Sequence, residues 1–81
     1  MSRTLQSPQH EALRAFLVEQ RKKAGLTQAE VAAKLGRHQS FIATVEAGQR
    51  PIDVVELLAF AKAIGFEPTA AIKRLLLVKA R

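Results

Sequence analysis

Gln39, Ser40 and Thr44 are three uncharged polar residues in one short segment that has the residue pattern of an α-helix. Ile42 and Val45 of the same segment lie three residues apart and form an apolar face, so the polar residues are expected on the opposite face. A face in contact with water alone would normally carry Lys, Glu and Arg. A Gln amide can bond N6 and N7 of adenine, and Ser or Thr hydroxyls can bond a base donor or acceptor. This face therefore indicates hydrogen bonding to base edges in the major groove of double-stranded DNA.

The net charge favours a polyanionic partner. Thirteen Lys and Arg against seven Asp and Glu give +6 at pH 7, and the pI is about 10.6. A positive charge could instead serve solubility alone or a membrane surface. No apolar run of about 18 residues and no signal-peptide pattern is present, so no membrane association is predicted.

No enzyme and no cofactor are predicted. The chain has no cysteine, and it has neither a clustered acidic pair nor a glycine-rich phosphate loop. His10 and His38 are too isolated in the sequence to form a metal site. The absence of cysteine fits a cytoplasmic protein.

The elements that position the polar face are five expected helices. Residues 1–6 are expected to be a flexible tail, and residues 7–81 a single all-α domain with a C-terminal dimerisation helix. Ser7 with Pro8 starts the first helix. Capping boxes start the second at Thr27–Glu30 and the fourth at Asp53–Glu56. The third helix is expected over 39–46, and the fifth opens at Pro68 with Ala71, Ile72, Leu75 and Leu76 as its inward stripe.

Four residues have the spacing of a bihelical scaffold. Ala32 is small where two steeply crossing helices touch, and Gly36 falls in the short turn, where a left-handed backbone is cheap for glycine. Ile42 and Val45 face back onto the second helix. A plain antiparallel helix pair is the alternative. The short, glycine-bent connection and the uncharged outer face of 39–46 favour a helix-turn-helix that reads DNA.

The segments LTQAEVAAKLG, QSFIATVEAGQR and DVVELLAFAKAIG resemble the phage-repressor and Cro-type (XRE-like) helix-turn-helix family, over about Leu13 to Ile72. The resemblance implies a compact five-helix, lambda-repressor-like domain that binds operator DNA as a two-fold dimer. It implies base reading by Gln39, Ser40 and Thr44. By position, Gln28 would cap the DNA-facing end of the second helix, contact a phosphate and brace the first reading residue.

The resemblance also implies an ion pair between Arg21 and Glu46. Its alternative is two separate surface charges of little energetic value. If the pair forms, we expect it to orient helices more than to stabilise them.

Three residues depart from the family pattern. Arg37 stands where a small or aliphatic residue is usual, and a cation near a helix start needs a compensating anion. It is predicted to contact a phosphate or a guanine, the alternative being a solvated turn arginine. His38 replaces the usual Ser or Thr cap, so the third helix should begin poorly capped. Phe41 could pack against the following loop, which we favour, or touch a thymine methyl.

The resemblance implies that the loop after the third helix lies along the phosphates, where Arg50 is the best candidate for a contact. Such contacts hold register and set salt dependence, and they do not choose sequence. The full set of predicted backbone-contacting residues is Gln28, His38, Arg50, Lys34 and Gln49, with Lys22 and Lys23 as weaker candidates.

The C-terminal helix is predicted to form a homodimer interface through Leu77 and Ala70, which remain outside once the inward stripe is packed. Scattered exposed apolar residues are the alternative. A two-fold dimer would place two reading helices about 34 Å apart on a pseudo-palindromic operator. The predicted function is a sequence-specific transcriptional regulator, most simply a repressor. The alternative is an interaction module of the same fold, such as an antitoxin that binds a toxin.

Overall fold

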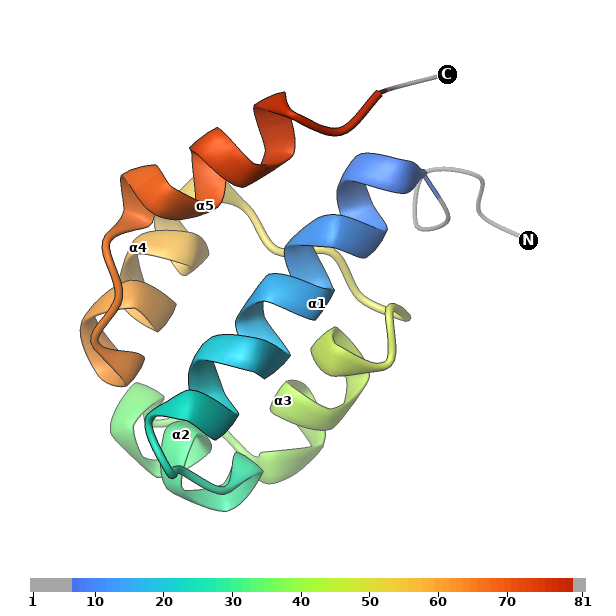
Figure 1. Ribbon diagram of the computed structural model, residues 1–81. Helices are drawn as coiled ribbons and strands as arrows, with labels where there is room; N and C mark the ends of the chain where they lie inside the picture. Colours follow the sequence, from blue (N-terminus) through green and yellow to red (C-terminus); the bar gives the residue numbers. More distant parts are fainter. Residues whose placement is uncertain (1–6, 80–81) are drawn as a thin grey trace.

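The computed structural model describes residues 7–79 and contains five α-helices joined by short loops (Figure 1). The helices are α1 (Pro8–Lys23), α2 (Gln28–Leu35), α3 (Gln39–Glu46), α4 (Val54–Ile64) and α5 (Pro68–Leu76). No strand occurs within residues 7–79. The predicted all-α, five-helix architecture is therefore confirmed. The predicted tail, 1–6, and the last two residues of the predicted domain lie outside the described residues.

The helix boundaries follow from local capping. The Ser7 side chain accepts a hydrogen bond from the backbone N–H of His10 at 3.0 Å, and both predicted capping boxes are formed. Gly36 ends α2 with a φ of +67°, in the left-handed region. The exception is α3, whose N-cap residue His38 makes no side-chain capping hydrogen bond. This helix begins poorly capped, as its sequence suggested.

The core lies where α1 crosses the other helices. Figure 1 shows α1 running between α5 on one side and α3 on the other. Phe16 and Leu17 are the buried residues of α1, and Phe66 packs edge-on against Phe16 with ring centroids 5.1 Å apart. The other buried hydrophobic residues are Val31, Ala32, Ile42, Val45, Leu57, Phe60, Ala61 and Ala71. None of the helices in the described part of the chain is both long and apolar enough to cross a membrane.

The predicted inward stripe of α5 is wrong at two of its four positions. Ala71 is buried and Leu75 is partly buried, but Ile72 and Leu76 are exposed. The helix lies at the edge of the domain against α1 and α4, which cover only a narrow strip of it. Phe60 of α4 is one of the largest fully buried side chains of the core.

Candidate nucleic-acid interface

The α2–α3 unit presents one face of α3 to the outside. Ile42 and Val45 of α3 are buried, as is Ala32 of α2, so close packing fixes the two helices against each other. The left-handed backbone of Gly36 makes the sharp turn between them. The four residues expected to form a scaffold therefore lie at the contact and at the turn.

The outward face of α3 carries the three predicted reading residues. Gln39 and Ser40 are exposed, and Thr44 is partly buried. The Thr44 hydroxyl lies within hydrogen-bond distance of two carbonyl oxygens of its own helix, Ser40 at 3.0 Å and Phe41 at 2.9 Å. Because its hydrogen is used there, Thr44 can offer a base edge an acceptor and a methyl group.

A polar chain connects Gln39 to the interior. The Gln39 amide donates to Oε1 of Gln28 at 3.4 Å, and the Gln28 amide donates to Oε1 of Glu46 at 2.9 Å. Gln28 is the first residue of α2, and the cap itself is Thr27, so the expected capping role belongs to Thr27. Gln28 instead lies between the first residue of α3 and the last, which holds the Gln39 side chain at one side of the reading face.

Arg21 anchors this chain. Its Nε donates to Oε2 of Glu46 at 2.6 Å and its Nη2 to Oε1 at 2.9 Å, and only 11% and 10% of the two side chains are exposed. A third bond runs from Nη1 to the carbonyl of Leu26 at 2.9 Å. Hydrogen bonding to Glu46 raises the pKa of Arg21 above its ordinary value, although burial acts the other way. The expected ion pair is thus a partly buried, bidentate contact between α1 and α3, with about a tenth of each side chain exposed.

The other flank of α3 carries a second group, which we call the arginine cluster: Arg37, Phe41, Arg50 and Glu56. The guanidinium carbons of Arg37 and Arg50 lie 3.8 and 4.7 Å from the centroid of the Phe41 ring. Phe41 itself packs on Phe60 with centroids 6.1 Å apart. Phe41 therefore packs inward and against a residue of the following loop, as favoured from the sequence.

Glu56 completes the cluster. Arg50 donates to its two carboxylate oxygens at 3.2 and 3.1 Å, and Arg37 Nη1 lies 3.9 Å from Oε2. The bonds from Arg50, followed by the backbone N–H of Asp53, hold the pKa of Glu56 below its ordinary value. Glu56 is the anion that the position of Arg37 required. Sequence reasoning gave it only a capping role; Arg50, six residues before Glu56, was the one local signal of an ion pair.

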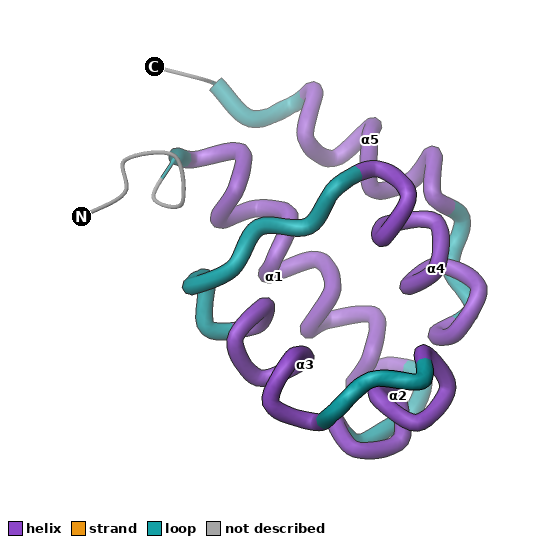
Figure 2. The backbone as a smooth tube through the Cα atoms, turned by 180° about the vertical axis from the view of Figure 1, so that it is seen from behind, coloured by secondary structure: helices purple, strands orange, loops and turns teal. Residues whose placement is uncertain are grey.

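The remaining predicted backbone-contacting residues differ in position. Loop 47–53 carries Gln49 and Arg50 and runs from the end of α3 to the start of α4 (Figure 2). Gln49 and His38 are exposed near the two ends of α3. Lys34 lies at the opposite end of α2 from Gln28, beside Ala59 and Lys62 of α4. Lys22 and Lys23 are exposed in the last turn of α1.

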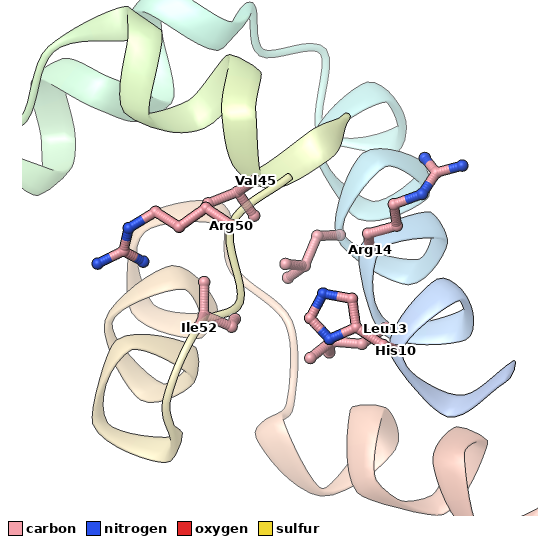
Figure 3. Close-up of a pocket in the computed structure, with 7 residues that line it drawn as sticks. His10, Leu13, Arg14, Val45, Arg50 and Ile52 are labelled. Atoms are coloured by element: carbon pink, nitrogen blue, oxygen red, sulfur yellow. The ribbon is translucent and has the colours of Figure 1, made fainter. Parts of the chain in front are cut away.

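The hollow between α1 and loop 47–53 is not a ligand site. It is lined by His10, Leu13 and Ile52 together with the stems of Arg14 and Arg50, and it has no room for a water molecule. Figure 3 shows both guanidinium groups pointing away from it. Within residues 7–79 no three His, Cys, Asp or Glu side chains are placed to hold a metal ion.

Comparison with known proteins places this geometry in a family. The sequence model of the family "Helix-turn-helix domain" matches residues 12–75. An XRE-family like protein from Pseudomonas syringae pv. tomato str. DC3000 is 43% identical, with a TM-score of 0.79 over 84% of this chain and 83% of that one. The chain belongs to the XRE-like helix-turn-helix family. It is accordingly a DNA-binding transcription regulator.

Two further solved proteins of this fold are restriction-modification controller proteins. C.AhdI from Aeromonas hydrophila is 33% identical, with a TM-score of 0.68 over 74% of this chain and 91% of that chain. C.Esp1396I, solved as a tetramer in complex with its natural 35 base-pair operator, is 18% identical and has a TM-score of 0.74 over 94% and 93% of the two chains. A search of curated proteins found no match.

Proposed function

We propose that this XRE-like protein is a sequence-specific repressor that binds a pseudo-palindromic operator as a homodimer, with α3 in the major groove. The observation that carries the proposal is the polar chain from Arg21 through Glu46 and Gln28 to Gln39. It holds an exposed amide at the start of α3, and a held amide can bond adenine in bidentate fashion with little further loss of side-chain freedom.

Each residue has a proposed role. Gln39, Ser40 and Thr44 read base edges, and Arg50, Gln28, Gln49 and His38 contact phosphates. Arg37 lies in the turn before α3 and reaches a phosphate or a guanine once it leaves Glu56. Lys34 has the weakest support, because it lies beside α4. Repression needs only occupancy of an operator that overlaps a promoter, and DNA binding alone supplies it.

The homodimer interface is proposed on exposed apolar residues of α4 and α5. Val54 and Leu58 are four residues apart on α4, and Ile72 and Leu76 are four apart on α5; we call these four residues the α4–α5 apolar surface. Val54 and Ile72 line one shallow apolar hollow, which makes the surface continuous across the two helices. Exposed apolar surface of this extent is typical of a protein contact.

Ala70 and Leu77, the predicted pair, are seven residues or about two helical turns apart and therefore share one side of the helix. Ile72 and Leu76 are offset from them and lie on a different side. Leu77 is the C-cap residue of α5 and is 82% exposed, while Leu76 is 75% exposed. The α4–α5 apolar surface offers four large residues where the predicted face offers one. A second copy of the chain is the proposed occupant, because a solved protein of this fold is a tetramer on its operator.

Selection of bound sequences from a random DNA pool tests the function. The expected result is a motif with dyad symmetry whose half-sites are about one helical turn, 34 Å, apart. A pool that remains random after selection would contradict sequence-specific binding. An enriched motif without dyad symmetry would contradict the homodimer but keep α3 as the reading helix.

Two neighbouring substitutions test the interface. Leu76→Asp is expected to give a monomer in analytical ultracentrifugation at micromolar concentration, whereas Leu77→Asp is expected to remain a dimer. Both residues are exposed to a similar degree, so neither change should unfold the domain. The reverse result would place the interface on the face of Ala70 and Leu77. A wild-type monomer would assign the surface to a different protein, such as a toxin.

A further inference from the structure

The arginine cluster contains two cations and one anion on the flank of α3. Arg50 makes a bidentate pair with Glu56 at 3.1 and 3.2 Å, while Arg37 reaches the same carboxylate at the longer distance of 3.9 Å. Both guanidinium groups lie over the ring of Phe41, which rests on Phe60. The aromatic platform is therefore fixed to the core, and the two arginines above it share one carboxylate, while Arg50 also donates to the carbonyl oxygen of Pro51 at 2.8 Å.

The cluster is open to solvent. The Arg37 and Arg50 side chains are 43% and 39% exposed, and Glu56 is 22% exposed. An ion pair at such a site is weak, because water and salt screen it, and its groups exchange partners readily. A DNA phosphate, like a carboxylate, presents two anionic oxygens and can accept paired N–H bonds from arginine.

We propose that Glu56 is an internal competitor of DNA phosphate: it occupies Arg37 and Arg50 in the free protein, and DNA binding replaces it at one or both arginines. The inference rests on the proposed function in one respect only: it assumes that Arg37 and Arg50 contact DNA. Every duplex offers phosphates, so this exchange costs the same on any sequence. Glu56 therefore lowers the affinity for all DNA, while Gln39 and its neighbours choose among sequences.

Glu56→Gln isolates this role. The amide oxygen of the introduced glutamine can still accept the backbone N–H of Asp53, which Glu56 accepts at 3.0 Å, so the capping box is retained. The arginines lose their charged partner. Thermal unfolding would verify that the variant folds as the wild type does.

Glu30→Gln is the matched control. Glu30 occupies the same position in the other capping box, where it accepts the backbone N–H of Thr27 at 2.8 Å. It takes part in none of the ion pairs found within residues 7–79. Its substitution removes one negative charge from the protein without releasing an arginine.

The measurement is fluorescence anisotropy on a random-sequence duplex and on the selected operator, over a range of salt concentrations. Glu56→Gln is expected to tighten binding to both duplexes by about two- to fivefold. Its salt slope should steepen by up to about one unit, since an arginine that Glu56 retains in the wild-type complex would gain a phosphate contact in the variant. Glu30→Gln should give less than half of this gain. In an Arg37→Ala/Arg50→Ala background, Glu56→Gln should no longer tighten binding.

Three results would overturn the inference. An equal gain in DNA affinity for Glu56→Gln and Glu30→Gln would mean that the change in net charge alone causes the effect. Weaker binding by Glu56→Gln would mean that Glu56 positions the arginines for DNA. A gain confined to the operator would assign Glu56 to base reading through Arg37. The measurement on the random duplex does not require a known operator, so it is independent of the pool selection. Failure of the pool selection would count only against sequence-specific binding.

Discussion

The helix α3, which we propose reads DNA, is flanked by two arginine–glutamate pairs with the same chemistry and different burial. Arg21 and Glu46 are 11% and 10% exposed, and their carboxylate also accepts the Gln28 amide. Arg50 and Glu56 are 39% and 22% exposed and share their site with Arg37. Both pairs are bidentate, with bonds between 2.6 and 3.2 Å.

The difference between the two pairs lies in what happens when a partner is removed. A buried charge without its partner has lost its water and gains nothing in return, so the first pair is held together. An exposed arginine that loses its partner is solvated by water or pairs with another anion, at little cost in free energy. The first pair therefore holds Gln28 and Gln39 in place, and the second leaves its arginines free to exchange partners, as the proposed DNA contacts require. Four predictions test this division, from the largest expected effect to the smallest.

Glu46→Ala is expected to lower the free energy of unfolding by about 2–3 kcal/mol, because it leaves the largely covered Arg21 without its anion and removes the acceptor of Gln28. Urea denaturation followed by circular dichroism would measure it. Glu19→Ala is the control, because it breaks an exposed pair with Arg74 and should cost less than about 1 kcal/mol. Equal losses in the two variants would remove the distinction between the pairs.

Gln39→Ala is expected to weaken binding to the operator by about 1–3 kcal/mol and to leave binding to random DNA nearly unchanged, since it removes a base contact. Electrophoretic mobility shift on both duplexes would measure it. Gln49→Ala removes another exposed amide, from loop 47–53, and should weaken both complexes alike. Undiminished specific binding by Gln39→Ala would mean that α3 is not the reading helix.

Arg50→Ala is expected to weaken binding to every sequence and to flatten the salt slope by about one unit, because one phosphate contact is lost. Its free energy of unfolding should change by less than about 1 kcal/mol. Lys62→Ala removes an exposed cation from α4 and should leave the slope unchanged. A large loss of stability in Arg50→Ala would show that the arginine cluster is structural.

Acid is expected to weaken the exposed pair through Glu56. Its pKa in the folded protein lies below the ordinary value of 4.5, chiefly because Arg50 donates to its carboxylate. A carboxylate of this kind stabilises the folded state above the unfolded pKa and loses that contribution as the pH falls through the folded pKa. The free energy of unfolding of the wild type should therefore fall more steeply below about pH 5 than that of Glu56→Gln. Parallel curves from urea denaturation would contradict this.

The parts of the fold that depend on neighbouring residues were predictable from the sequence. The Thr27–Glu30 and Asp53–Glu56 boxes and the left-handed turn at Gly36 involve groups within a few residues of one another. The all-helical fold followed from them and from the spacing of apolar residues.

What the sequence missed depends on contacts between distant helices. Ile72 and Leu76 are exposed because α1 and α4 cover only part of α5. The spacing of apolar residues along α5 does not show how much of the helix is covered. Glu56 reaches Arg37 across the whole of α3 and the following loop, and its capping role concealed this contact. The Arg21–Glu46 pair spans 25 positions and was expected only through the family resemblance.

The pairing of the first and last helices has a mechanical consequence. Gln9, in the first turn of α1, donates to the carbonyl oxygen of Leu75, near the end of α5, at 3.1 Å, so the start of α1 lies beside the end of α5 (Figure 1). A force pulling these two ends apart would load their contacts one after another rather than all together. α5 would then separate from α1 at low force. The contacts between α2 and α3 are far from both pulled ends, so this unit would stay folded at that force.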